Sequence, residues 1–415
     1  VLNLSHPVGM GQEEKTVMMI YNAVVCPMDK PQIPNGFVAW DSGGITQVGD
    51  MSQCPAPVPD QDVDAQGGYV LPGFVDVHCH LGLLADGLSY DEDDCNEVSD
   101  PCTPQLRAID ALYPLDHCFQ EAREAGVTTV LTSPGSANAI GGQIAAIKTV
   151  GRWADDMVVL EPAAMKFALG ENPKKTYSGR NEAPATRMAT AALMREQLRK
   201  ALEYAERISK HEADPENEDA PDYDAVLEAL VPVVHGKLPV HFHAHRADDI
   251  ATALRIAKEF HLNYVLIHAT EGYLVADILA REGARAVVGP IIGDRSKPEL
   301  AHQRVTNAAR LVEAGVPVAI CTDHSELPIQ YLLLSAALAA GEGMNPEAAL
   351  KAITLTAAEL GGIAHRVGSL TPGKDADIVL CSGHPFELNT KVQAVFINGT
   401  PVKSFHKAVS DRRKT

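Results

Sequence analysis

The 415-residue sequence lacks several features that mark other classes of protein. It contains no run approaching the roughly 20 apolar residues that span a bilayer. Its first residues lack the charged and apolar regions of a signal peptide. Its eight cysteines are scattered, without the paired CxxC spacing of a structural zinc site. These absences predict a cytoplasmic protein with reduced, mostly buried thiols; the alternative is an exported protein with a Cys95–Cys102 bridge.

Positive charge is also scarce. Lys and Arg number 35 against 54 Asp and Glu, which gives a formal net charge of −19. Long-range attraction to nucleic acid or to an anionic bilayer is therefore disfavoured. We expect neither a nucleic acid nor a membrane as partner.

The chain is long enough for two structural units, since single cores stop growing near roughly 250–300 residues. Short strand-like runs occur at both ends, as MMIYNAVV and GFVAW near the start and as DADIVLC and VQAVFING near the end. We predict a small β-sandwich domain built jointly by residues 16–72 and 366–408. Residues 73–365 form the second predicted domain.

Between the two ends, strand-like apolar runs alternate with amphipathic helical stretches, which is typical of βα repetition and a parallel sheet. The candidate strands are VLPGFVDVHCH, GVTTVLTS, QIAAIKT, MVVLEPAAMKF, LPVHFHAH, NYVLIHAT, AVVGPII and VPVAICTD. Eight strands are what a closed α/β (β/α)₈ TIM-like barrel needs. Helices are expected over 248–260, 272–282 and 298–313, and the stretch 187–235 must hold more than one. Barrels of this kind often pair, so we expect a homo-oligomer.

Histidines and an aspartate stand at the ends of these strands, where a (β/α)₈ barrel carries its active site. His78 and His80 are two residues apart, which places both on one face of an extended strand. Further along, HFHAH, IH and TDH end three more strands. A lone histidine at a strand end is more often a core residue, but four strands agree here. Imidazole and carboxylate ligands suit zinc and similar divalent ions.

Several motifs carry a family resemblance. The segment GYVLPGFVDVHCH (68–80) resembles the strand-one hallmark of the amidohydrolase superfamily, and VGSLTPGKDADIV (367–379) resembles the segment that re-enters its split β domain. HAHRADD, IHATEGY and CTDHSELP are similar to the branch with imidazolonepropionase-like and Xaa-Pro dipeptidase-like proteins. The resemblance spans roughly residues 18–402.

The resemblance implies a ligand set and a mechanism. The implied metal ligands are His78, His80, His243, His268 and Asp323. Asp323 and His268 are the predicted catalytic residues: Asp323 matches the aspartate that takes a proton from the attacking water and returns it to the leaving nitrogen. Metal lowers the pKa of bound water to about 7. His245 is the competing ligand on its strand, and His241 is expected deeper in the barrel.

Lys166 decides between one metal ion and two. In binuclear members of the superfamily a lysine at a strand end is carboxylated and bridges the ions, and AAMKFALGENP places Lys166 where that lysine falls. The alternative is an ordinary ion pair, for example with Glu161. A free ammonium facing a dication is strongly unfavourable. The expected cofactor is therefore one or two ions of Zn²⁺ or a similar metal, with a carboxylated Lys166.

Substrate recognition has weaker signals in the sequence. Polar side chains in the loops after the ligand-bearing strands are candidates to hold a substrate carboxylate. They are His245, Arg246, Lys174, Tyr177, Arg180 and Arg295. Lys175, Lys297 and Tyr273 lie in the same loops, and solvated loop charge is the alternative interpretation.

Three functions compete. The first is hydrolysis of an amide, peptide or cyclic amide bond in a small-molecule substrate. The second is deamination of an amino-substituted heterocycle, for which a single metal ion beside an unmodified Lys166 is expected. The third is a non-catalytic barrel that serves as an interaction module, but loss of metal ligands is typical of such relatives and every ligand position here is filled.

Overall fold

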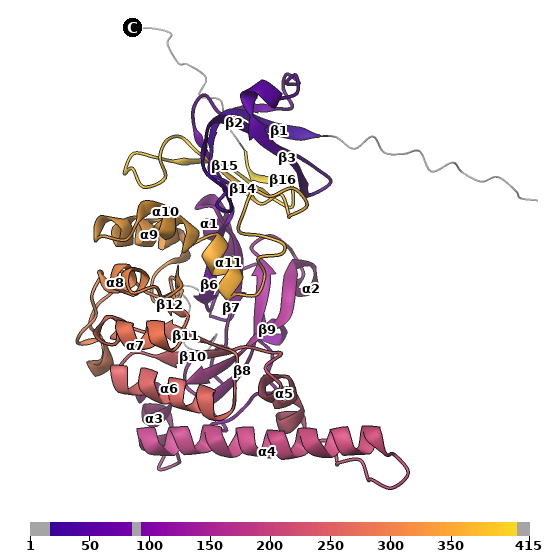
Figure 1. Cartoon of the computed structure of the whole chain (residues 1–415), viewed down its shortest axis with the longest axis vertical. Coiled ribbons are helices and arrows are strands. Elements are labelled where there is room, and N and C mark those ends of the chain that lie inside the picture. The colour runs from indigo at the N-terminus through magenta and orange to yellow at the C-terminus, as the bar shows by residue number, and fades with distance from the viewer. Residues whose placement is uncertain (1–16, 85–92, 405–415) are drawn as a thin grey trace, which may run out of the picture.

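The computed structural model describes residues 17–84 and 93–404. Two β-sheets organise this part of the chain (Figure 1). Sheet A lies at one end of the molecule, at the top of Figure 1. Sheet B forms the barrel beneath it, with helices along its outer side and the long helix α4 at the opposite end.

Sheet A joins strands from both ends of the chain. Its order is β16-β15-β14-β5-β1-β2-β3, and β4 pairs with β1. Its strands are β1 (Met18–Val25), β2 (Ile33–Asp41), β3 (Gly44–Asp50), β4 (Val63–Asp64), β5 (Tyr69–Pro72), β14 (Ile378–Cys381), β15 (Val392–Ile397) and β16 (Thr400–Lys403). The two ends meet where β14 runs antiparallel to β5, with Ile378 opposite Pro72. The further division into the two layers of a sandwich stays a prediction, as do the domain limits.

Sheet B has eight strands in the order of the sequence, β6 to β13. They are β6 (Phe74–Cys79), β7 (Val127–Thr132), β8 (Ile140–Lys148), β9 (Val158–Ala168), β10 (Val240–Ala244), β11 (Tyr264–His268), β12 (Ala286–Val288) and β13 (Val318–Ile320). Each overlaps one of the eight predicted strands. Most of their residues are buried, as expected of strands covered on both faces. The predicted TIM-like barrel of eight strands is confirmed.

One strand of the barrel runs in the opposite direction to the others. β8 is antiparallel to both β7 and β9, whereas the remaining neighbours are parallel. Residues 133–139 connect β7 to β8 without a helix. A parallel crossover needs a dozen or more residues, so a link this short permits only an antiparallel neighbour. The barrel therefore departs from a strict (β/α)₈ repeat at its third strand.

The barrel nearly closes between β13 and β6. At the histidine end, the backbone NH of Asp323 donates to the carbonyl of His78 (3.2 Å), and that of His80 to the carbonyl of His324 (2.8 Å). At the other end a short segment lies between the strands, because Val75 donates to Ile353 and Ile320 donates to Ala352. These bonds hold the ends of β6 and β13 side by side.

The helices cover the outside of the barrel. They are α1 (Cys118–Glu124), α2 (Ala154–Met157), α3 (Glu171–Ser178), α4 (Arg187–Ala213), α5 (Ala225–Val234), α6 (Ala247–Glu259), α7 (Ala276–Arg281), α8 (Asn307–Glu313), α9 (Leu332–Gly341), α10 (Pro346–Lys351) and α11 (Leu355–Leu360). Short 3₁₀ turns are η1 (Met51–Gln53), η3 (Ala108–Ala111), η4 (Gly272–Leu274), η5 (Pro298–Leu300) and η6 (Ile329–Tyr331). The stretch 187–235 holds two helices, as predicted. The helix expected over 298–313 is instead η5 followed by α8.

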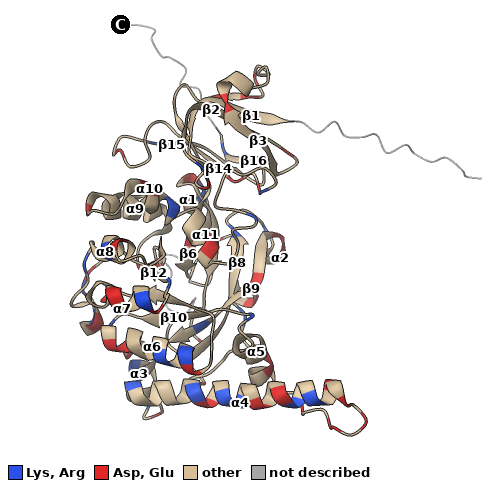
Figure 2. Cartoon of the chain, viewed as in Figure 1, with Lys and Arg blue, Asp and Glu red and all other residues tan. Residues whose placement is uncertain are grey.

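Amphipathic sequence explains why these helices pack on the barrel. In α6 the buried side chains include Ile250, Ala253, Leu254 and Ala257, which recur at helical spacing along one face. α4 begins after Thr186, whose hydroxyl accepts from the backbone NH of Ala189. Its exposed side carries Lys, Arg and Glu in alternation (Figure 2). One face of α6 is thus fixed on the sheet, while much of α4 faces solvent.

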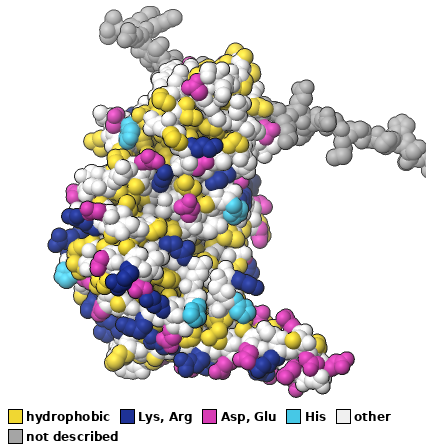
Figure 3. Space-filling model, in the orientation of Figure 1, with side chains coloured by type: hydrophobic (Ala, Val, Ile, Leu, Met, Phe, Trp, Pro, Cys, Tyr) yellow, Lys and Arg dark blue, Asp and Glu magenta, His cyan; other side chains and the backbone are white. Residues whose placement is uncertain are grey.

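Within residues 17–84 and 93–404, no helix has both the length and the apolar composition needed to cross a bilayer. On the face shown in Figure 3, Lys and Arg are interspersed with acidic and apolar side chains. All eight cysteines lie in the described part of the chain; none forms a disulfide, and seven of them are buried. The alternative of a Cys95–Cys102 bridge is therefore wrong.

A buried ion pair joins the reversed strand of the barrel to sheet A. Lys148 ends β8, and reversal places it at the end of the barrel opposite the histidines. Its Nζ lies 2.6 Å from Asp377 Oδ2 and 2.9 Å from Asp375 Oδ2, with both Lys148 and Asp377 buried. Asp377 Oδ1 also accepts from the backbone NH of Asn398 (3.0 Å). The motif KDADIV thus reaches back across the chain to neutralise Lys148.

Removing Lys148 is expected to destabilise the fold strongly. A Lys148→Ala change leaves Asp377 charged and buried without its cation, which costs about 3–5 kcal/mol in such cases. Urea unfolding measures this as a lower free energy of unfolding. Lys200→Ala is the control, because the Lys200–Glu196 pair is exposed and such i,i+4 pairs contribute only about 0.3–0.5 kcal/mol. Equal effects of the two changes contradict the bridging role of Lys148.

Candidate active site

A first group of ligand-type side chains forms where β6 ends and β13 is followed by its loop. Asp323 Oδ1 lies 3.2 Å from His78 Nε2 and 3.3 Å from His80 Nε2. His78 is fully buried, and His80 is 8% exposed. Two imidazoles and one carboxylate thus converge on one point, as the spacing of the HCH motif predicts.

Asp76 holds the backbone on both sides of this group in place through hydrogen bonds. Its Oδ2 accepts from the backbone NH (3.0 Å) and hydroxyl (2.5 Å) of Thr322, and its Oδ1 accepts from the backbone NH of His78 (3.2 Å). A buried carboxylate on β6 therefore holds the residue before Asp323. Nothing in our sequence analysis singled out Asp76, although it lies two residues before His78 on the same face of the strand.

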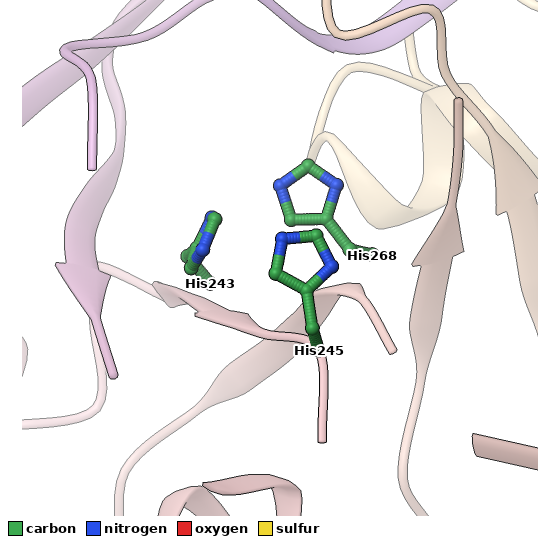
Figure 4. A group of neighbouring side chains, drawn as sticks. All are labelled: His243, His245 and His268. Carbon is green, nitrogen blue, oxygen red and sulfur yellow. The ribbon is translucent and has the colours of Figure 1, made fainter. Parts of the chain in front are cut away.

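A second group lies at the ends of β10 and β11. His243, His245 and His268 present ring nitrogens within 4.8 Å of one another. Figure 4 shows the three rings close together, with His268 drawn above His245. The rings of His245 and His268 are stacked. Their ring centroids are 4.5 Å apart with an interplanar angle of 15°. The two groups adjoin, since the rings of His78 and His268 are 5.3 Å apart.

Hydrogen bonds at Nδ1 orient four of the five imidazoles in the two groups. The Nδ1 of His243 lies 2.9 Å from the Ser136 hydroxyl, and that of His245 lies 2.7 Å from the Thr270 hydroxyl. The Nδ1 atoms of His80 and His268 lie 2.6 and 2.7 Å from the backbone carbonyls of Ser133 and Gly289. A ligating histidine typically uses its second nitrogen in this way. Nε2 is then the atom available to a cation.

The chemistry of the imidazole nitrogens in the second group fits a metal. Burial lowers the pKa of His243 and His245 well below the usual value and lowers that of His268 to about 4. Neutral imidazoles are the form that ligates metal. The Nε2 atoms of His243 and His245 are buried, and neither makes a hydrogen bond in the described part of the chain. Such unsatisfied buried acceptors are costly unless a cation or water meets them.

Lys166 stands at the end of β9, opposite His241 on β10 and Gly142 on β8. It is fully buried, and its Nζ lies 3.5 Å from His78 Nε2. Burial lowers the pKa of Lys166 to about 8. Glu161 instead pairs with Arg107, whose two guanidinium nitrogens lie 2.7 and 2.8 Å from its carboxylate. The alternative of a Lys166–Glu161 pair is therefore wrong.

Two of the predicted ligands sit on strained backbone. His268 has φ of 71° and Asp323 has φ of 54°. Non-glycine residues rarely adopt this left-handed region, and such strain gathers at functional sites. His241, by contrast, has no positive φ angle.

His241 is buried, two residues before His243 on the same strand, and its ring makes no hydrogen bond among the described residues.

A cavity of about 520 Å³ opens over both groups. Its lining includes His80, His243, His245, His268 and Asp323. Five predicted substrate-binding residues do not line it: Arg246, Lys174, Tyr177, Arg180 and Arg295. Arg246 pairs with Asp248 (2.9 Å), and the buried Tyr177 donates to Asn138 (2.6 Å). Arg180 donates to the carbonyl of Val98 (2.6 Å), and Arg295 to that of Gln303 (3.4 Å).

Neighbouring cations line the cavity instead. They are Lys175, Lys297 and Arg304. Lys175 contacts Glu171, and Lys297 Nζ lies 3.3 Å from Glu299 Oε1. Arg304 lies over the Tyr273 ring, 5.3 Å from its centroid. In the described ranges no carboxylate forms an ion pair with Arg304, so its charge remains available to a ligand.

Sequence reasoning also missed Glu299. It lies in η5, within the stretch interpreted as one continuous helix. Its side chain is fully buried, and its Oε1 lies 3.6 Å from His245 Nε2. A Pro-Glu pair in a loop carries no periodic signal, so only the folded chain reveals this carboxylate beside the histidines.

Comparison with known proteins agrees with this geometry. The model of the amidohydrolase family matches residues 69–402. An amidohydrolase of Thermotoga maritima has a solved structure with a TM-score of 0.88 and 38% identity, which covers 93% of this chain and 100% of that one. A prolidase complexed with N-methylphosphonate-L-proline shares the fold, with a TM-score of 0.59 and 18% identity over 94% of this chain and 100% of that one.

Two curated relatives have similar sequences. The amidohydrolase tasK of Hapsidospora irregularis is 32% identical over 88% of this chain, which spans only 39% of that longer protein. The imidazolonepropionase of Symbiobacterium thermophilum is 26% identical, with 85% of each chain covered. The match to the family model covers the barrel strands and both groups of ligand-type side chains.

Proposed function

Since the chain belongs to the amidohydrolase family, we propose that it is a metal-dependent hydrolase of the carbon–nitrogen bonds of small amides that carry a carboxylate. The observation that supports this most is the convergence of His78, His80 and Asp323 beside a second group of three histidines under one cavity. Acyclic peptides, N-acyl amino acids and cyclic amides all contain such a bond.

The proposed cofactor is Zn²⁺ or a similar divalent ion. His78, His80 and Asp323 would hold one ion, and His243 and His268 a second. The distances from Asp323 Oδ1 to the Nε2 atoms of His78 and His80, 3.2 and 3.3 Å, suit the first ion, because two ligands about 2.1 Å from a tetrahedral ion lie about 3.4 Å apart. Divalent metal there supplies a water nucleophile at neutral pH and polarises the scissile carbonyl.

Asp323 is the proposed acid and base. The neighbouring imidazoles outweigh the effect of burial and hold the pKa of its carboxyl well below the usual range. An ionised carboxylate can accept a proton from the attacking water. The same oxygen can then pass that proton to the leaving nitrogen, which cannot depart as an amide anion.

Carboxylation of Lys166 is proposed as the link between the two ions. Only the neutral amine reacts with carbon dioxide, and burial already lowers the pKa of Lys166 to about 8. A buried ammonium beside His78 would repel a dication, whereas a carbamate carries the opposite charge. The absence of any acidic partner for Lys166 among the described residues favours the modified form.

Arg304 is the residue we propose for holding the substrate carboxylate. Hydrogen bonds to charged groups contribute about 1.5–3 kcal/mol, so Arg304→Gln should raise KM for N-acyl amino acids by about 10- to 100-fold. The corresponding uncharged carboxamides should be affected much less. Steady-state kinetics with the two substrate series measures the difference.

Arg295→Gln is the matched control for this change. Arg295 lies in the same connection but does not line the cavity, so its loss should alter neither series. If Arg295→Gln selectively impairs carboxylate substrates while Arg304→Gln does not, the sequence prediction holds and the assignment to Arg304 is wrong.

A substrate screen tests the function itself. The metal-loaded protein is assayed against N-acyl amino acids, Xaa-Pro and other dipeptides, cyclic amides and amino-substituted heterocycles. We expect turnover of at least one carboxylate-bearing amide, followed as a new amine or carboxyl group. Release of ammonia from a heterocycle alone points to deamination instead.

A further inference from the structure

Glu299 occupies a position that the proposed ligand set leaves unexplained. It is a fully buried acid in η5, after β12, and its carboxylate faces His243 and His245 of the second group. Its Oε1 lies 3.6 Å from His245 Nε2 and 3.9 Å from His243 Nε2. The three atoms are buried, and none makes a hydrogen bond among the described residues.

The two distances from Glu299 Oε1 to the histidine Nε2 atoms indicate whether the atoms contact one another directly or share a ligand. Hydrogen bonds between nitrogen and oxygen span 2.7–3.2 Å, so 3.6 and 3.9 Å are too long for direct contact. Two ligands of one tetrahedral ion lie about 3.4 Å apart, which is close to the observed values. A cation among Oε1 and the two Nε2 atoms satisfies all three at once.

The rest of the carboxylate is held so that Oε1 stays directed at the histidines. Oε2 accepts from the backbone NH of Glu171, the first residue of α3 (3.1 Å). Gly170 makes this approach possible: its φ is +88°, and a Cβ there would lie 2.7 Å from Oε2. A side chain at position 170 would displace the carboxylate. The helix start thus fixes one oxygen and leaves the other for a ligand.

From this geometry we infer that Glu299 and His245 are additional metal ligands. With His243 they would form a site of two imidazoles and one carboxylate, next to His268. This inference rests on the proposed metal-dependent function and extends its ligand set. The carboxylate supplies negative charge that a site of neutral histidines alone lacks, and it strengthens the binding of a dication.

Lys297 offers the competing explanation. Its Nζ lies 3.3 Å from Glu299 Oε1 and 3.4 Å from Asn172 Oδ1. On that view Glu299 merely orients a lysine in the wall of the cavity. The two explanations differ in what removal of each residue does to the metal, because Lys297 repels a cation and Glu299 attracts one.

The affinity for zinc therefore distinguishes the two explanations. Chelator-stripped parent, Glu299→Gln and Lys297→Met proteins are titrated with Zn²⁺ against a chromophoric chelator, and bound zinc is counted by elemental analysis. Loss of outer partners alone weakens metal binding about 10- to 100-fold. Glu299→Gln should therefore weaken one zinc site at least about tenfold, while Lys297→Met leaves that site as tight as the parent or tighter.

A second variant and a folding measurement distinguish the loss of a ligand from misfolding. His245→Gln should weaken the same zinc site, and circular dichroism checks that each variant is folded. If Glu299→Gln binds zinc as tightly as the parent, Glu299 is not a ligand although the enzyme is still metal-dependent. A parent protein that takes up no zinc refutes the proposed function itself, which is a different result.

Discussion

Asp323→Asn is expected to reduce kcat by about 10²- to 10⁴-fold, the usual contribution of a positioned acid and base. The amide cannot accept the proton of the attacking water or return it to the leaving nitrogen. Asparagine keeps an oxygen facing His78 and His80, so the variant should remain folded and bind metal. Steady-state kinetics and elemental analysis on the same sample measure both properties.

The control for this prediction removes a negative charge elsewhere. Asp277 lies exposed on α7, away from the cavity lining, and Asp277→Asn should leave kcat at the parent value. A folded, metal-loaded Asp323→Asn protein that turns over substrate as fast as the parent removes Asp323 from the mechanism.

Lys166→Met should lose one metal ion and most of its activity. A bridging carboxylate cannot form without the amine, so the second ion loses an anionic ligand. The several kcal/mol of charge stabilisation that a metal supplies correspond to a fall in kcat of about 10²-fold or more at 1.36 kcal/mol for each factor of ten. Elemental analysis and kinetics test this together.

Lys166→Glu provides the matching rescue. Glutamate brings a permanent carboxylate to the same strand position, although on a shorter side chain, and should recover part of the second metal. ¹³C NMR of the parent in labelled bicarbonate should show a carbamate carbon that Lys166→Met lacks. Full metal content and activity in Lys166→Met would mean that the lysine is not a bridge.

Much of the barrel could be predicted because each strand is a short apolar run that ends at a polar residue. The reversal of β8 could not, since QIAAIKT has the same apolar pattern whichever way it runs. The direction of β8 is decided by the short connection 133–139 and by the ion pair that Lys148, at the end of the strand, forms with Asp377. Lys148 fits only where Asp377 neutralises it, and that pairing joins residues 229 positions apart.

The active site, like the barrel, could be predicted only in part from the sequence. Histidines at strand ends were visible in the sequence, and the structure brings His78, His80 and Asp323 together, and His243, His245 and His268 together. Loop residues were less predictable. Periodicity says nothing about a side chain in a turn, so Glu299 was missed, and the predicted cations lie beside those that line the cavity. Loop conformation decides that Arg304 faces it while Arg295 binds a backbone carbonyl.

Zinc titration of the chelator-stripped protein is the most direct test of the account. Calorimetry should show zinc binding to the parent and loss of that binding in a folded His78→Gln/His268→Gln double variant, which removes one imidazole from each group. Zinc uptake by the double variant equal to that of the parent would show that these imidazoles do not surround an ion.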